Sequence, residues 1–209
     1  MDGTAHRIVV VGLGDSITAG NPGYDPDPAK QPFEGDDPES QYLYWAAKAD
    51  PRIDFRNHGV GGEVTEEILA RFDQAVAGGC DVLIVQGGIN DVYHHRPIEE
   101  AARNLERMVR MGKERGYGVV MPDVLPWNKG WPDAEAPIRA LNGMIREIGQ
   151  AEGIAILPFH DTLEDPDRPG RMREDWTPDG NHPNVAGHRR LGELAFALAP
   201  ALAPPLPAA

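Results

Sequence analysis

Cysteine is almost absent from this chain of 209 residues. The single Cys80 excludes a disulfide within the chain. Cys80 follows two glycines and precedes an apolar stretch, with no histidine nearby in sequence, so we expect a half-buried packing thiol rather than a nucleophile. No apolar run approaches the length needed to cross a membrane, and the first seven residues lack the basic-then-apolar pattern of a secretory signal. The sequence therefore predicts a cytoplasmic protein.

Basic residues are also scarce. The chain has 20 Lys and Arg against 33 Asp and Glu, a formal net charge of −13. Nucleic-acid phosphates and anionic membrane surfaces both require clustered positive charge, so neither is an expected partner. A small-molecule substrate fits this composition.

Serine is the third rarity, because only Ser16 and Ser40 occur. Ser16 directly follows an apolar run at residues 8–11, which we expect to end as a strand at Gly12 and Gly14. Sites in α/β proteins form at the carboxyl ends of strands. If a serine performs chemistry here, Ser16 is the candidate.

Strand and helix patterns alternate along the whole sequence. Strands are predicted at 8–11, 53–57, 81–86, 118–122 and 154–158; helices are predicted at 40–48, 64–76, from Pro97, around 138–148, and from Pro183 to 198. The alternation predicts a single α/β domain over 1–209, a five-stranded parallel sheet with helices on both faces. Its core would span about 7–198, followed by a Pro/Ala-rich tail at 199–209. Residues 21–39, dense in Pro, Asp and Gly, are expected to form a solvated surface loop, with a lid as the alternative.

Further polar and glycine-rich segments follow other predicted strands. Residues 57–63 contain Gly59, Gly61 and Gly62 just before a helix, which suits either a cluster of N–H donors for an oxyanion or a tight turn. Asn90 and Asp91 follow the third strand. Asn90 could direct an amide donor into a cleft while Asp91 fixes the loop, or both could cap the next helix.

Asp179 and His182 precede the last predicted helix, which we expect Pro183 to begin. A carboxylate three residues before an imidazole can receive one ring N–H and leave the other nitrogen as a base. The alternative is an Asx turn in which His182 caps the helix. Acyl transfer requires a nucleophile, a base, an orienting group and oxyanion donors, and the strand ends offer all four.

In these segments the sequence resembles the SGNH subgroup of GDSL esterases and lipases. The resemblance covers roughly residues 7–198 and rests on four blocks in order. They are Gly14-Asp15-Ser16-Ile17, the glycine at Gly62, Gly88-Ile89-Asn90-Asp91 and Asp179-Gly180-Asn181-His182-Pro183.

The resemblance implies a flavodoxin-like three-layer fold and hydrolysis of esters without a metal or cofactor. Ser16 would be the nucleophile, His182 the base and Asp179 its orienting partner. The oxyanion would be held by the backbone N–H groups of Ser16 and Gly62 and by the side-chain amide of Asn90. We expect short acyl or acetyl esters as substrates. The alternatives are thioester or lysophospholipid cleavage, or a non-catalytic binding domain on the same scaffold.

Several aromatic and histidine residues could contribute to substrate binding. Trp127 and Trp131 follow the fourth strand and could line an acyl or sugar pocket, or pack the Pro-rich loop that carries them. His94 and His95 are expected at the cleft rim; adjacent histidines do not face the same way, so they predict no metal site.

Three other features suggest functions that we do not expect. Gly12-x-Gly14 lacks the third glycine of a dinucleotide-binding fingerprint, because Ile17 stands in its place. His160-Asp161 is expected to pack at a strand end rather than form a second acid–base pair. His188 is expected on a helix surface.

Overall fold

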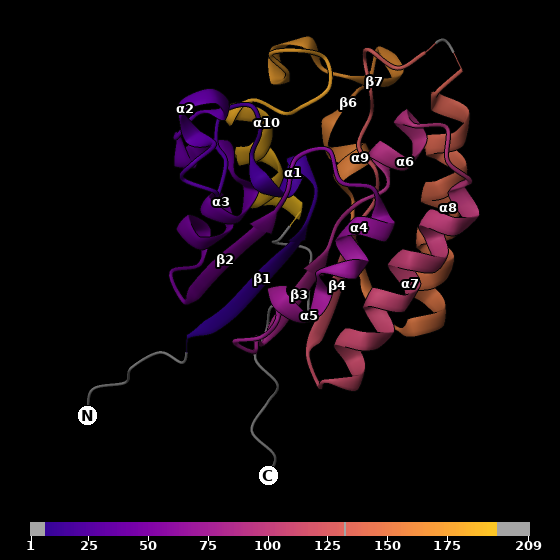
Figure 1. The fold of residues 1–209 in the computed structure, drawn as a ribbon. Coiled ribbons are helices and arrows are strands. Elements are labelled where there is room, and N and C mark those ends of the chain that lie inside the picture. Colours follow the sequence, from indigo (N-terminus) through magenta and orange to yellow (C-terminus); the bar gives the residue numbers. More distant parts are fainter. Residues whose placement is uncertain (1–6, 132, 196–209) are drawn as a thin grey trace.

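The computed structural model describes residues 7–131 and 133–195, so the predicted tail at 199–209 lies outside the described residues (Figure 1). Five parallel strands form the central sheet in the order β2-β1-β3-β4-β5. They are β1 (Ile8–Gly14), β2 (Ile53–Gly59), β3 (Val82–Val85), β4 (Gly118–Pro122) and β5 (Ala155–Leu157). The predicted α/β class with a five-stranded parallel sheet is confirmed.

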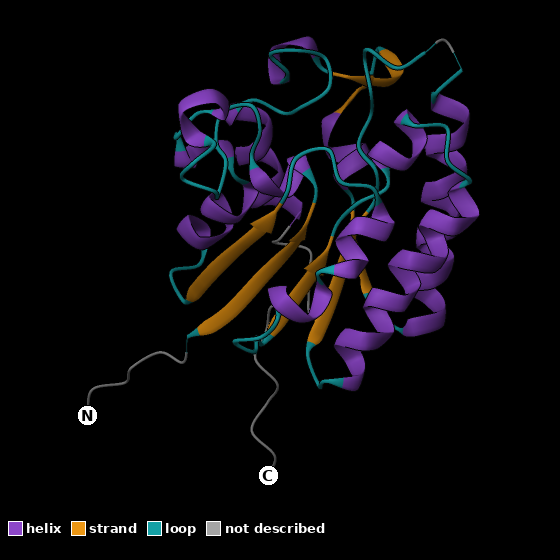
Figure 2. Ribbon diagram, viewed as in Figure 1, coloured by secondary structure: helices purple, strands orange, loops and turns teal. Residues whose placement is uncertain are grey.

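Helices cover both faces of this sheet, which gives the three layers (Figures 1 and 2). One face packs against α4 (Thr65–Ala70), α5 (Phe72–Ala75), α7 (Ile98–Glu114) and α8 (Glu135–Glu152). The other packs against α3 (Tyr42–Ala49), α9 (Phe159–Leu163) and the segment after α10 (Val185–Arg190). Successive strand side chains alternate between the two cores: Val10 joins one, and Val11 and Leu13 join the other.

The first strand is longer than expected, because β1 continues through Gly12 to Gly14. In this stretch Gly12 pairs with Asn57 and Gly14 with Gly59 of β2. A Cβ on Gly14 would collide with the side chains of Thr18 and Gln86, so the strand can end under α1 (Ser16–Ala19) only with glycine there. With glycine at these positions, β1 continues up to Gly14, and the next residue, Asp15, caps α1.

Two predicted helices differ in their bounds. The helix expected at 64–76 divides into α4 and α5 at Arg71, whose backbone leaves helical geometry. The last helix begins at Val185 rather than Pro183, because the Asn184 side chain accepts the Gly187 N–H and caps it. His182 therefore precedes the helix by two residues and does not cap it.

Some elements and positions were not predicted. The segment after β5 forms α9 and a small antiparallel pair, β6 (Glu164–Asp165) with β7 (Arg168–Met172). His188 is fully buried rather than exposed, and it stacks on Tyr42 with ring centroids 6.4 Å apart. Burial lowers the pKa of His188 to about 3, so this ring stays neutral in the core. Within the described residues, no helix has the length and apolar character to cross a membrane.

Candidate active site

Ser16, just after β1, and His182, in the loop before α10, lie side by side. Ser16 is the first residue of α1, and the Asp15 side chain caps this helix by accepting the Ile17 N–H at 2.9 Å. The Ser16 side chain faces the loop before α10, where His182 Nε2 lies 3.1 Å from Ser16 Oγ. These two residues stand 166 positions apart in sequence, and the fold makes them neighbours.

Asp179 completes a continuous hydrogen-bonded chain. Its Oδ2 lies 2.7 Å from His182 Nδ1, and its Oδ1 accepts the backbone N–H groups of Asn181 and His182 at 2.8 Å each. Burial raises the pKa of Asp179, but the hydrogen bonds from His182 and Asn181 outweigh it and hold the pKa below its usual value. An ionised Asp179 keeps the proton on Nδ1 and leaves Nε2 free to accept the serine proton.

Ser16, Gly62 and Asn90 each carry a potential hydrogen-bond donor at the same pocket. The Ser16 N–H opens α1 and has no acceptor within that helix. Gly62 adopts a left-handed φ of +83°, and no atom lies within 4 Å of the place where a Cβ would stand. The Asn90 amide donates one hydrogen to the Glu63 carbonyl at 2.9 Å, which fixes its orientation and leaves the second hydrogen for a ligand. All three residues line one pocket with His182.

Asp91, next to Asn90, supports this loop. Its two carboxylate oxygens accept the Thr65 N–H at 2.9 Å and the Thr65 hydroxyl at 2.8 Å. These bonds join the α6 segment (Ile89–Tyr93) to the start of α4. Neither Asn90 nor Asp91 caps α6, because Gly88 occupies the N-cap position. The predicted loop-fixing role of Asp91 fits these contacts.

The pocket has a volume of about 440 Å³, which suits a small ligand. It is lined by Ser16, Ile17, Asn21, Asp25, Lys30, Glu34, Gly61, Gly62, Ile89, Asn90, Tyr93, Trp127, Asn181 and His182. Residues 21–34 build one wall, so the segment expected as a solvated loop is part of the pocket. It contains the short helix α2 (Gln31–Glu34).

Trp127 both lines the pocket and holds the loop that carries Asp179 and His182. Its indole N–H donates to Asn181 Oδ1 at 2.6 Å, and the next residue, Asn128, donates its backbone N–H to the Gly180 carbonyl at 2.9 Å. Trp131 and His94, the other two residues predicted to bind substrate, pack behind residues that line the pocket. Trp131 packs edge-on against Trp127 with centroids 5.5 Å apart, and His94 packs against Tyr93 at 4.8 Å. Neither lines the pocket.

Two supporting residues were missed in the sequence analysis. The Arg71 guanidinium donates to the carbonyls of Gly14 and His58, each at 2.7 Å, and pairs with Glu63 at 2.6 Å. It thereby ties together the loops after β1 and β2. The only sequence signal for this role of Arg71 was its charge, which lies between the apolar positions of the helix predicted at 64–76. The other is Asn21, which follows Gly20, the C-cap of α1, and precedes a proline.

Asp15 had no assigned role in the sequence analysis. It is completely buried, its backbone N–H donates to the Gln86 side chain at 3.1 Å, and its Oδ2 has no hydrogen-bond partner. Burial raises the pKa of Asp15 to about 6, against hydrogen bonds that lower it. Its contacts make Asp15 the cap that orients Ser16.

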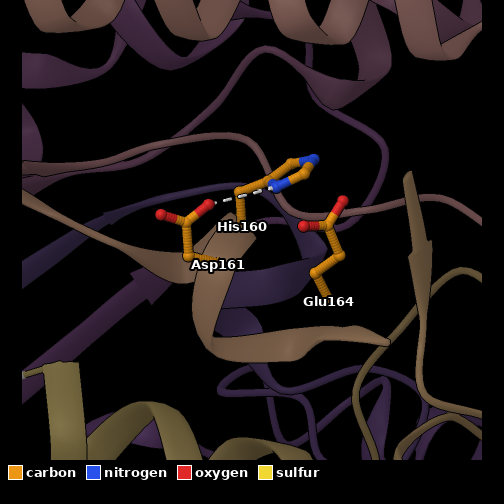
Figure 3. A group of neighbouring side chains, drawn as sticks. All are labelled: His160, Asp161 and Glu164. Atoms are coloured by element: carbon orange, nitrogen blue, oxygen red, sulfur yellow. Dashed lines mark ion pairs between the residues drawn. The ribbon is translucent and has the colours of Figure 1, made fainter. Parts of the chain in front are cut away.

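His160 and Asp161, drawn beside Glu164 in Figure 3, are not among the residues that line the pocket, so they do not compete with Asp179 and His182 there. The His160 ring lies 3.6 Å from Asp161, and the His160 backbone N–H donates to the buried Asp123 carboxylate. His160, Asp161 and Glu164 place three potential metal-ligand atoms within 4.8 Å of one another. Arg139 already pairs with Glu164 at 3.4 Å and opposes a further cation there.

Comparisons with known proteins show the family and the fold of this chain. Residues 13–190 match the model of the GDSL-like lipase/acylhydrolase family. Solved structures with the same fold include a putative lipolytic protein of the G-D-S-L family from Desulfitobacterium hafniense, 21% identical over 90% of this chain and 97% of its own, with a TM-score of 0.74. Another is an acetylxylan esterase from Geobacillus stearothermophilus, 19% identical over 91% of this chain and 93% of its own, with a TM-score of 0.72. A search of curated proteins gave no match. The family match, which covers most of the sequence and every element of the site, shows that this chain belongs to the GDSL-like lipase/acylhydrolase family of hydrolases.

Proposed function

We propose that this protein is a serine esterase that hydrolyses short-chain acyl or acetyl esters through an acyl-enzyme. The observation that carries the proposal is the continuous hydrogen-bonded chain from Asp179 through His182 to Ser16 at the pocket floor. Ser16 Oγ attacks the ester carbonyl while His182 Nε2 takes its proton. Asp179 stabilises the imidazolium that forms.

The tetrahedral intermediate carries a negative oxygen that needs preorganised donors. The backbone N–H groups of Ser16 and Gly62 and the Asn90 amide supply them. His182 then gives its proton to the leaving alkoxide, and the acyl group stays on Ser16. Water enters, His182 removes a proton from it, and a second tetrahedral intermediate collapses to release the acid and free Ser16.

The size of the pocket supports a short acyl group. A volume of about 440 Å³, lined in part by Ile89, Tyr93 and Trp127, must hold both parts of the ester. The likeness to an acetylxylan esterase makes acetylated sugars worth including among the esters to be assayed.

A panel of p-nitrophenyl esters from acetate to palmitate, run beside acetylated sugars, tests this proposal. We expect kcat/KM to be highest for acetate or butyrate and to fall at longer chains, because the pocket cannot enclose them. Rates that rise with acyl length would favour lysophospholipid cleavage, and preference for an acyl thioester would favour a thioesterase. A folded protein that hydrolyses none of these compounds would favour the non-catalytic binding domain.

A further inference from the structure

The wall formed by residues 21–34 contains two carboxylates that share one donor. Asn21, 5% exposed, directs its Nδ2 toward Asp25 Oδ2 at 3.3 Å and Glu34 Oε2 at 3.2 Å, and also toward the Tyr24 carbonyl at 3.3 Å. An amide nitrogen has two hydrogens for these three acceptors. The Asp25 and Glu34 carboxylates therefore share one amide donor, and the only other hydrogen bond to either among the described residues is from the Asp27 backbone N–H to Asp25 Oδ1 at 2.8 Å.

Neither carboxylate takes part in a salt bridge with Lys or Arg within the described part of the chain. Lys30 lines the same pocket but stays beyond ion-pair distance of both. Two like charges at one wall repel each other, and a cation placed between them would remove that repulsion.

The other end of Asn21 also faces the pocket floor without a partner. Asn21 Oδ1 is buried and accepts no hydrogen bond within the described part of the chain. It is directed at Gly61, where a Cβ would stand 2.9 Å from it. The two carboxylates fix this orientation, because a reversed amide would turn its oxygen toward them. This wall therefore presents the Asp25 and Glu34 carboxylates to the pocket beside the cationic side chain of Lys30.

The opposite wall has a different character. Tyr93, 56% exposed, and Trp127 lie there with ring centroids 5.7 Å apart, beside Ile89. In Figure 1, α2 and α6 lie on opposite sides of α1, the helix that begins at Ser16. An ester carbonyl held at Ser16 would therefore extend one part toward the aromatic side chains and the other toward Asp25 and Glu34.

We propose that the pocket selects esters that carry a positively charged ammonium group, which is placed against Asp25 and Glu34. This proposal rests on the esterase function proposed above and adds the class of substrate. A neutral polyol could donate hydrogen bonds to the same wall, but it would leave the negative charge of Asp25 and Glu34 uncompensated. The formal net charge of −13 adds a long-range attraction for cationic esters over neutral ones.

A pair of isosteric esters isolates the charge. Acetylcholine and 3,3-dimethylbutyl acetate have the same shape, and only the first has a cationic nitrogen. We expect kcat/KM, each divided by the rate of alkaline hydrolysis, to be about tenfold higher for acetylcholine. Betaine methyl ester and methyl 3,3-dimethylbutanoate form the matching pair with the charge on the acyl side. The pair that shows the larger ratio identifies which part of the ester reaches Asp25 and Glu34.

Variants locate the preference on this wall. Glu34→Gln keeps the shape of the side chain and removes its charge, so the cationic-to-neutral ratio should fall at least about threefold. Lys30→Gln should raise the ratio. Asp36→Asn removes an exposed carboxylate from the same segment, outside the pocket, and should leave the ratio unchanged. In the wild-type protein, added salt should lower kcat/KM for acetylcholine more than for its neutral isostere, a readout that requires no variant.

The outcomes separate this proposal from the esterase function. Equal normalised kcat/KM values within both pairs would overturn the cationic substrate class while leaving a Ser16-dependent esterase intact. An equal loss of preference in Glu34→Gln and Asp36→Asn would overturn the assignment to this wall. Hydrolysis of none of the four esters, nor of p-nitrophenyl acetate, would overturn the esterase function and this inference together.

Discussion

Replacing Asp179 by Asn should disable His182 through its tautomer rather than through its position. Asp179 Oδ1 accepts the backbone N–H groups of Asn181 and His182, and the Thr177 hydroxyl approaches the same oxygen at 3.4 Å. These donors would hold the Asn oxygen in that place. The Asn NH₂ would then occupy the position of Oδ2, 2.7 Å from His182 Nδ1.

An NH₂ group at that position donates to Nδ1, so the ring proton must move to Nε2. Nε2 would then be a donor toward Ser16 Oγ and could not accept the serine proton. We expect kcat to fall about 10⁴-fold, the loss associated with the wrong tautomer in a serine-type triad, equivalent to about 5 kcal/mol of activation free energy.

Steady-state hydrolysis of p-nitrophenyl acetate measures this effect, with thermal unfolding to confirm that the variant is folded. Asp175→Asn is a matched control, because it removes an exposed carboxylate that pairs with Arg173 and does not line the pocket. The control should retain wild-type kcat. A folded Asp179→Asn variant within tenfold of wild type would refute the orienting role of Asp179.

Three further predictions concern the surroundings of Ser16. Asn90→Ala should lower kcat about 10²–10³-fold with p-nitrophenyl acetate and leave the melting temperature near wild type; an unchanged kcat would remove Asn90 from the oxyanion site. Trp127→Phe removes the donor to Asn181, so kcat should fall about tenfold, whereas Trp131→Phe should not reproduce the loss. The pKa of Asp15 is about 6 in the folded protein, above the ordinary value of 3.8. Between these two pH values the native protein therefore binds more protons at Asp15 than the unfolded chain does. Asp15 consequently lowers the stability as the pH rises from about 4 to 6. Relative to wild type, urea unfolding of Asp15→Asn should show a gain of about 2 kcal/mol between pH 4 and pH 7, and parallel curves would contradict the burial argument.

The sheet was predictable because each strand carries a local signal. The runs around Val10, Ile84 and Val120 are apolar and short, and helical stripes separate them, so pattern alone predicts a parallel α/β sheet. Residues that end or interrupt an element were harder. Arg71 divides a continuous apolar stripe because its side chain bonds to two distant carbonyls, and those partners do not show in the local sequence.

The residues brought together in the site could be chosen from the sequence because strand ends meet at one edge of a parallel sheet. Ser16 and His182 follow from that rule and from the resemblance. The walls could not be chosen in this way. Asn21, Asp25 and Glu34 lie in a segment whose composition is typical of a surface loop, and its fold depends on bonds among those residues. His188 shows the same limit, since its burial against Tyr42 depends on how α10 packs.

The central claim is that Ser16 is the nucleophile of an esterase, and covalent labelling with a fluorophosphonate tests it most directly. Mass spectrometry of the treated protein should find one adduct on the peptide that contains Ser16, with activity lost in proportion to labelling. His182→Ala should slow this labelling strongly, because the hydroxyl would lose its base. A folded, active protein whose Ser16 remains unlabelled, or a Ser16→Ala variant with full esterase activity, would contradict the account.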